Sequence, residues 1–198
     1  YIDGYTVVVN KSTVPVGTGQ EVHDILSQFL DEDLYDVVSN PEFLREGSAV
    51  EDFMRPDRVV VGVESEKAAS VLRSLYRPLS LRDVPLVTTK RVTAELIKYA
   101  ANAFLATKIS FINEIADLCE ATGANVQEVA SGIGLDGRIG SKFLHPGPGY
   151  GGSCFPKDTL ALLRTAEAFH SPLHIVQATV DVNDQRKKNM AQRIINAF

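Results

Sequence analysis

Short runs of apolar, mostly β-branched residues alternate with longer segments of helical spacing in the first ninety residues. The runs predict strands at 6–9, 36–38, 59–63 and 86–88, and the spacing between them predicts helices at about 19–30 and 66–76. Alternation of strand and helix on this scale is typical of βα units built around a mostly parallel sheet. Residues 1–90 are therefore expected to form an α/β domain.

The pattern changes after residue 90. From Thr93 to about Thr122 neither proline nor glycine interrupts the chain, and apolar residues recur at helical spacing. Thr93 can cap the start of this helix and Gly123 its end. At ~1.5 Å per residue the helix would be about 40 Å long, which suits a connection between two domains or two subunits. Further helices are predicted at 125–130, 159–170 and 172–198, so residues 91–198 are expected to be all-α.

Composition narrows the possible partners. The 198 residues carry a formal net charge of -5, and no block of Lys and Arg stands out, so neither nucleic acid nor an anionic membrane is the expected partner. The longest apolar runs are too short to span a bilayer. The chain has only two cysteines, which predicts reduced thiols in a cytoplasmic protein. Its four histidines have no Cys or His partners at metal-ligand spacing, so no metal site is expected.

Candidate chemistry is concentrated in the glycine-rich stretch 147–158, where four glycines precede Cys154. Pro156 suits the first turn of a helix, which would place Cys154 at a helix N-terminus, where backbone N–H groups favour a thiolate. Asp158 follows one turn later on the same face, and Lys157 adds a positive charge. The stretch indicates a reactive thiol with an acid/base neighbour. The alternative is a buried structural cysteine beside a turn, and the glycines favour the reactive thiol.

Other polar residues are candidates for supporting roles. Lys98 and Asn102 stand one helical turn apart and could supply a cation and an amide donor to an oxyanion, or could be a solvated pair. Glu42 and Glu46 could be acid/base groups or the acidic first turn of a helix. Thr13, in the loop after the first strand, could donate to a phosphate, orient a water or cap a helix.

Five motifs in order along the chain closely resemble the UDP-glucose 6-dehydrogenase family. They are the segments 11–17, 40–47, 95–104, 136–140 and 151–158. Enzymes that oxidise GDP-mannose or UDP-N-acetyl sugars share the same plan, but their cysteine loops typically diverge from the Gly-Gly-Ser-Cys-Phe-Pro-Lys-Asp found here. The resemblance therefore favours UDP-glucose. A non-catalytic dimerisation module is the rival hypothesis.

The resemblance implies a fold and an activity. Residues 1–90 would be the later part of a Rossmann-like NAD-binding domain, and residues 91–198 a long connecting helix and a central helical dimerisation domain. The activity would be the NAD-dependent oxidation of UDP-glucose to UDP-glucuronate for polysaccharide biosynthesis, in a cytoplasmic homodimer. The sequence starts at Tyr1 without an initiator Met, and it lacks both the family's N-terminal Gly-x-Gly-x-x-Gly unit and its C-terminal UDP-binding domain. We therefore expect a segment of a longer enzyme.

The resemblance also implies residue roles. Cys154 would bind the intermediate aldehyde as a thiohemiacetal and then a thioester, Lys98 and Asn102 would stabilise the oxyanion, and Glu42, Thr13 and Asp158 would position or deprotonate water. Arg138 would reach the substrate of a neighbouring subunit. The sugar nucleotide would contact Glu42, Phe43, Leu44, Arg45, Glu46, Lys98, Asn102, Arg138, Phe143, Leu144, His145, Pro146, Gly147 and Gly151. NAD would contact Thr13, Glu46 and Lys157.

Overall fold

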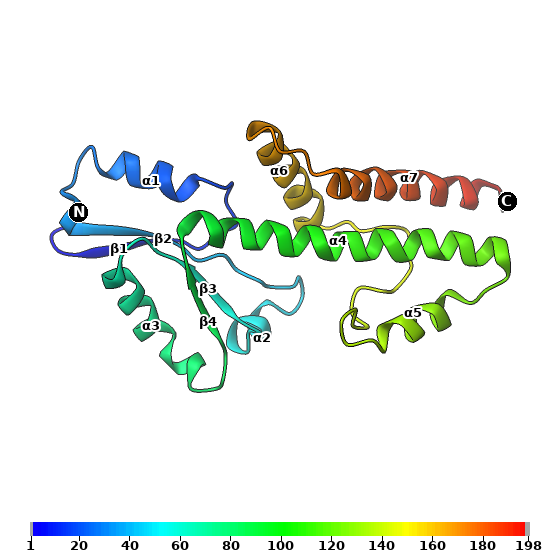
Figure 1. Ribbon diagram of the computed structural model, residues 1–198, viewed down its shortest axis with the longest axis horizontal. Coiled ribbons are helices and arrows are strands. Elements are labelled where there is room, and N and C mark those ends of the chain that lie inside the picture. Colours follow the sequence, from blue (N-terminus) through cyan, green and yellow to red (C-terminus); the bar gives the residue numbers. More distant parts are fainter. Residues whose placement is uncertain (1, 197–198) are drawn as a thin grey trace. The chain divides into compact units, whose positions relative to one another are not determined.

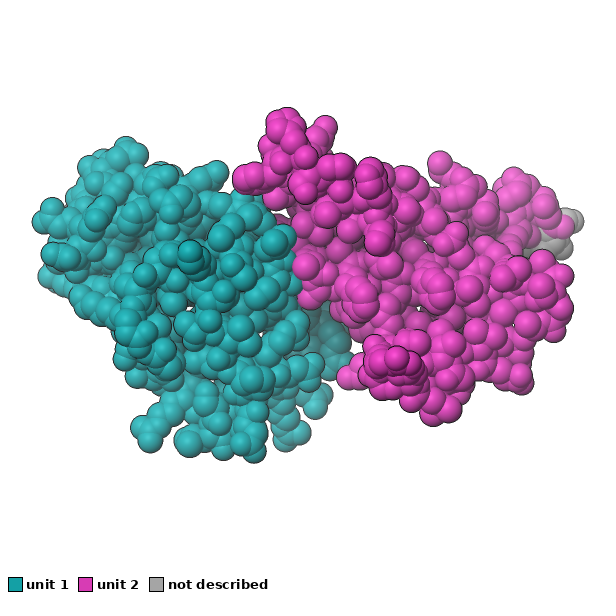
Figure 2. All heavy atoms as spheres, viewed as in Figure 1, with its two compact units in different colours: residues 1–98 teal, residues 99–198 magenta. Residues whose placement is uncertain are grey.

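The computed structural model describes residues 2–196. The chain divides into two compact units, residues 1–98 and residues 99–198, shown in separate colours in Figure 2. The division falls inside one continuous helix, α4 (Arg91–Thr122). Each unit has its own hydrophobic core.

Unit 1 is built on a four-stranded sheet with the strand order β1-β2-β3-β4 (Figure 1). The strands are β1 (Thr6–Asn10), β2 (Tyr35–Ser39), β3 (Val59–Gly62) and β4 (Leu86–Thr89). The pairs β1/β2 and β3/β4 are parallel, whereas β2 and β3 meet in antiparallel orientation. Two of the three pairings are thus parallel, which agrees with the prediction of a mostly parallel sheet, and the third is antiparallel. Between β2 and β3 the chain forms only one short helix, the six-residue α2 (Ala49–Met54).

The helices of unit 1 pack around this sheet. They are α1 (Thr18–Leu26), a 3-10 turn η1 (Glu32–Leu34) and α3 (Glu66–Ser80), together with the first residues of α4. The core lies between the sheet and α3, which buries Ala68, Leu72 and Tyr76 at successive turns against Val38 and Val61. The predicted strands and both helices of this half are present, although α1 ends four residues before Leu30.

Helix α4 is the longest element, with 32 residues. It begins at Arg91, two residues before the predicted Thr93, and it ends at Thr122 as predicted. Gly123 follows with φ +77, a conformation that glycine adopts without steric cost and that commonly ends helices. The uninterrupted helix follows from the absence of proline and glycine between residues 91 and 122.

Unit 2 is helical, as the sequence predicts. Besides the later part of α4 it contains α5 (Val126–Gly134), α6 (Cys154–Ala168) and α7 (His174–Asn196) (Figure 1). Its core joins Ile112 of α4, Ala130 of α5 and Leu144 from the connection between α5 and α6. Residues 197 and 198 of the last predicted helix lie outside the described residues. Between residues 2 and 196, no helix is both long enough and apolar enough to cross a bilayer.

Candidate active site

Three of the predicted site residues meet at one carboxylate in unit 1. Glu42 lies in the loop after β2, and its Oε1 is 3.2 Å from the Nζ of Lys98 and 3.3 Å from the Oγ1 of Thr13. Its Oε2 accepts a hydrogen bond of 2.6 Å from the backbone N–H of Leu44. Lys98 is only 3% exposed, so the solvated reading of this lysine is wrong. Glu42 precedes α2 by several residues and is not part of a first helical turn.

The surroundings of Glu42 keep it ionised. Partial burial raises the pKa of this carboxyl. The N–H of Leu44, the charge and hydrogen bond of Lys98 and the hydroxyl of Thr13 together lower it by more, so the pKa lies below its ordinary value. At neutral pH the cluster therefore contains an ammonium, a carboxylate and a hydroxyl in contact. Such a group can hold a polar substrate atom and accept a proton from it.

The loops that carry this cluster meet because β1 and β2 are parallel and end at the same edge of the sheet. Asn40, which follows β2, donates its N–H to the carbonyl of Asn10 at the end of β1 (2.9 Å), and its side chain donates to Val60 (2.7 Å). Lys11 donates to the carbonyl of Asn40 from the other loop (3.2 Å). Asn40 is 1% exposed, so these bonds form in a protected environment and fix both loops.

Glu95 is a functional candidate that sequence reasoning missed. Its carboxylate is 3% exposed and accepts three hydrogen bonds, from the N–H groups of Gly17 (2.7 Å) and Gly19 (2.9 Å) and from the hydroxyl of Ser39 (2.7 Å). The two N–H groups belong to the N-terminus of α1, where helices favour negative charge. A Cβ at Gly19 would lie 2.9 Å from Oε1 of Glu95, so this close approach requires glycine.

A periodic signal in the sequence could have identified Glu95. Arg91, Glu95, Lys98 and Asn102 are all less than a tenth exposed and recur along α4 at the spacing of one helical face. We call these four residues the buried polar stripe. Charged and amide side chains are rarely buried without partners, so their recurrence along one face of a helix indicates a specific set of contacts.

We predict that Glu95→Gln lowers the stability of unit 1 by about 3 kcal/mol, because hydrogen bonds to a buried charge are worth more than those to a neutral amide. Urea unfolding of the 198-residue chain measures the change. Glu66→Gln is the matched control, because Glu66 is 83% exposed and its ion pair with Arg73 is expected to contribute little. An equal, small loss in both variants would contradict the role of Glu95.

Cys154 is the first residue of α6, and Pro156 lies in the first turn of that helix, as predicted. The cysteine is partly exposed, whereas Cys119 is buried, so the buried structural reading fits Cys119 and not Cys154. The hydroxyl of Ser153 lies 3.7 Å from the sulfur of Cys154. Phe155 packs edge-on against the rings of Phe143 and Tyr150, with ring centroids 6.1 and 5.9 Å away.

A second charged cluster surrounds Asp158, one turn after Cys154. Asp158 is 1% exposed, and its Oδ2 accepts a hydrogen bond of 2.6 Å from the side-chain amide of Asn102. Its Oδ1 lies 2.7 Å from Nζ of Lys157, which is half exposed. The hydrogen bond to Asp158 raises the pKa of Lys157, burial lowers it, and the charges of Asp158, Tyr99 and Cys154 raise it further, for a net increase. The Lys157 ammonium therefore persists at neutral pH close to the sulfur.

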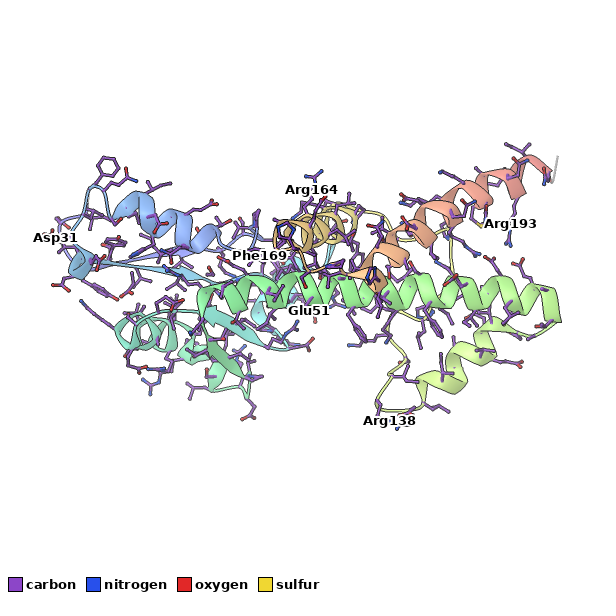
Figure 3. All side chains as sticks on the ribbon, turned by 45° about the horizontal axis from the view of Figure 1, so that its top comes forward. Asp31, Glu51, Arg138, Arg164, Phe169 and Arg193 are labelled. Atoms are coloured by element: carbon purple, nitrogen blue, oxygen red, sulfur yellow. The ribbon has the colours of Figure 1, made fainter. Side chains whose placement is uncertain are left out.

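The remaining candidates differ in their surroundings. The side chain of Leu144 is 3% exposed and belongs to the core of unit 2, which leaves its backbone for ligand contacts. Arg45 and Arg138 are largely exposed, and each forms an ion pair with an aspartate nearby in sequence. Arg138 lies at the tip of the connection after α5 (Figure 3). His145, Glu46 and Gly151 are exposed.

Gly147 and Gly151 differ from the glycines that the fold requires. Neither has a positive φ, and a Cβ at either position would meet no atom within 4 Å. Gly149 and Gly152, in contrast, have φ values of +115 and +77, which disfavour other residues. Among residues 2–196 no group of three or more His, Cys, Asp or Glu side chains is arranged to hold a metal ion.

Two models of one protein family match this chain. Residues 1–80 match the NAD binding domain of the UDP-glucose/GDP-mannose dehydrogenase family, and residues 92–185 match the central domain of the same family. The chain is 64% identical to the UDP-glucose 6-dehydrogenase of Rhizobium meliloti, over 99% of this chain and 45% of the relative. It is 50% identical to the UDP-glucose 6-dehydrogenase TuaD of Bacillus subtilis, over 100% of this chain and 42% of that protein.

Solved structures give the same result. A UDP-glucose dehydrogenase from Pyrobaculum islandicum superimposes with a TM-score of 0.86 at 46% identity, over 91% of this chain and 41% of that one. A UDP-D-ManNAc dehydrogenase from Pyrococcus horikoshii has a TM-score of 0.82 at 27% identity, over 97% of this chain and 45% of that one. The chain thus spans less than half the length of these relatives. By sequence and by fold, it belongs to the UDP-glucose/GDP-mannose dehydrogenase family.

Proposed function

We propose that this chain carries the catalytic thiol of an enzyme that oxidises UDP-glucose to UDP-glucuronate with NAD. The observation that carries the proposal is the position of Cys154 at the first turn of α6, with the buried Asp158 carboxylate and its Lys157 ammonium one turn later. A thiol in this environment suits nucleophilic attack on a carbonyl. The identity of 64% to a UDP-glucose 6-dehydrogenase supports the substrate.

The proposed reaction removes two hydrides from one carbon. The primary alcohol loses a hydride and a proton to become an aldehyde, and the Cys154 thiolate adds to the aldehyde carbon to give a thiohemiacetal. Loss of a second hydride and of the hydroxyl proton gives a thioester. Water then adds to the thioester carbonyl, the carbon–sulfur bond breaks, and the carboxylate and the free thiol form. NAD supplies the acceptor for both hydrides.

Both polar clusters have a role in this proposal. Lys98 and Asn102 donate to the oxygen of the reacting carbon while it bears negative charge. Glu42, with Thr13, and Asp158 position water or accept protons, because each carboxylate is held by charged or amide donors. Thr13 is also proposed to contact NAD, since it follows β1 at the edge of the sheet where such folds bind dinucleotides. Glu46 and Lys157 complete the proposed NAD contacts.

The segment from Phe143 to Gly147 and Gly151 is proposed to line the sugar nucleotide. The fold does not require glycine at positions 147 and 151, and close approach of backbone to a ligand gives a reason for it. The loop after β2, from Glu42 to Glu46, is proposed to contact the same ligand. The exposed Arg138 is proposed to reach the substrate of a second subunit.

Two alternatives stay open to test. A related nucleotide sugar, such as UDP-N-acetylmannosamine or GDP-mannose, could be the substrate, but the compared dehydrogenases for these sugars are only 27% and 30% identical. A non-catalytic dimerisation module would use Cys154 only structurally. Turnover with UDP-glucose and with GDP-mannose, in a polypeptide of the relatives' length that includes this chain, distinguishes the sugars.

We predict that iodoacetamide near neutral pH labels Cys154 about 10-fold faster than Cys119, because Cys154 is partly exposed at the start of α6 and Cys119 is buried. Peptide mass spectrometry measures both rates in the same sample, so the buried Cys119 is an internal control. In the longer polypeptide, UDP-glucose should slow the labelling of Cys154 alone. Equal, slow labelling of both thiols, unaffected by the sugar nucleotide, would support the module instead.

A homodimer through α4 is also proposed. Phe104, Phe111 and Leu118 are 67%, 49% and 58% exposed and recur every seven residues, which gives α4 an apolar stripe that a second copy of the same stripe can cover. Light scattering should find a dimer for the native chain and a monomer for Phe111→Glu. Phe29→Glu, at an exposed phenylalanine of unit 1, should stay dimeric. If Phe111→Glu is still a dimer, the interface lies elsewhere.

A reducing cytoplasm, which keeps Cys154 as a free thiol, is the proposed location.

A further inference from the structure

We propose that Asn183 and Arg186 of α7 are positioning residues that fix the segment 147–150, which precedes Cys154 in the chain. The inference rests on the proposed function, because it assigns a role toward the thiol and its sugar nucleotide. Neither residue is among the predicted site residues. Both are polar and buried, at 3% and 6% exposed, and both face the glycine-rich segment.

Asn183 pairs with the backbone of a single residue. Its Oδ1 accepts a hydrogen bond of 2.7 Å from the N–H of Tyr150, and its Nδ2 donates to the carbonyl of Tyr150 at 3.2 Å. The side chain thus satisfies both main-chain polar groups of Tyr150, in the way that a neighbouring strand would. In an irregular segment these buried groups have no ladder partners, so Asn183 sets where the segment lies.

Arg186 holds the other end of the same segment. Its Nε donates to the carbonyl of Gly147 at 2.9 Å, and its Nη1 donates to the carbonyl of Asn113 and pairs with Asp117, both on α4. Asn113 in turn accepts a hydrogen bond of 2.7 Å from the N–H of Gly147 through its Oδ1. The segment is therefore fixed at Gly147 and at Tyr150 by side chains of α4 and α7.

Gly149 shows how closely the segment approaches α7. It has φ +115, and a Cβ at this position would lie only 2.7 Å from Oδ1 of Asn183. Tyr150, once fixed, packs edge-on against Phe155, the residue after Cys154, at 5.9 Å between ring centroids. A chain of direct contacts thus runs from α7 through Tyr150 to the first turn of α6. Displacement of the segment should move the proposed sugar-nucleotide contacts at Gly147 and Gly151 without removing any group that reacts.

The test compares Asn183→Ala with Thr179→Val. Thr179 lies one turn earlier on α7 and is 4% exposed, and its hydroxyl contacts Thr107 and the carbonyl of Ile175, so its replacement costs a buried hydrogen bond away from the segment. Hydrogen exchange in the 198-residue chain should be about 10-fold faster or more at the amide of Tyr150 in Asn183→Ala, and unchanged there in Thr179→Val. If Asn183→Ala does not fold, Asn183→Ser is used in its place.

Kinetics of a polypeptide of the relatives' length give the functional readout. Asn183→Ala should raise KM for UDP-glucose about 10-fold or more with a smaller change in kcat, whereas Thr179→Val should keep both within about 2-fold. Unchanged Tyr150 exchange, or equal kinetic effects of the two variants, would overturn the positioning role. Failure of the native polypeptide to oxidise any sugar nucleotide would instead overturn the proposed function, and the exchange result at Tyr150 would still decide whether Asn183 fixes the segment.

Discussion

Replacement of Cys154 by serine should abolish acid formation and stop the reaction after the first oxidation. The serine hydroxyl is a far weaker nucleophile than the thiolate, so the aldehyde is no longer captured, and the rate of UDP-glucuronate formation should fall by more than ~1,000-fold. The yield of NADH per sugar consumed should fall from two to one. Absorbance of NADH together with mass spectrometry of the sugar nucleotides measures both quantities.

Cys119→Ala is the matched control for this variant. Cys119 is a buried residue of α4, so its replacement should cost some stability and leave the ratio of NADH to sugar unchanged. Full acid production by Cys154→Ser would remove the covalent step from the mechanism. An equal loss in the two variants would indicate damage to the fold of unit 2.

Lys98→Met should lower kcat about 100-fold or more and change the binding of UDP-glucose much less. Methionine keeps the length of the side chain but removes the ammonium that is proposed to stabilise the oxyanion, and loss of one such donor typically costs this amount. Steady-state kinetics and equilibrium binding of UDP-glucose, both in the longer polypeptide, separate the two effects. Glu42 loses its neighbouring cation as well, so the pKa of this carboxyl should rise.

Lys90→Met is the control for the change of charge, because Lys90 is exposed and directly precedes α4. Its kcat should equal that of the native protein. An effect of Lys98→Met confined to binding would make Lys98 a substrate contact and no longer an oxyanion donor. Retention of full turnover would remove Lys98 from the mechanism.

Much of the candidate site could be predicted because local rules place it. Thr13 and Glu42 each follow a strand, and parallel strands end at one edge of the sheet, so the two side chains meet. Pro156 indicated a helix start at Cys154, and helical spacing placed Asp158 one turn later. These inferences depend on residues that are close in sequence or on a general rule of sheet topology.

The missed features depend on contacts between distant parts of the chain. Glu95 accepts hydrogen bonds from Gly17 and Gly19, which lie 78 and 76 positions earlier in the sequence. Asn183 accepts one from Tyr150, which lies 33 positions earlier. No short motif records such a pairing, although the buried polar stripe of α4 gave an indirect sign of it. The antiparallel contact of β2 with β3 is likewise a single pairing, Ser39 with Gly62, that strand patterns do not reveal.

The carboxylate of Glu95 has a consequence for how a dinucleotide can bind. Residues 17–19 contain two glycines at the start of a helix, a composition that elsewhere receives a diphosphate. Here the Glu95 carboxylate already accepts the hydrogen bonds of the Gly17 and Gly19 N–H groups. A second negative group at this place would find no free donor and would be repelled by the carboxylate. The start of α1 is therefore not available to the pyrophosphate of a dinucleotide.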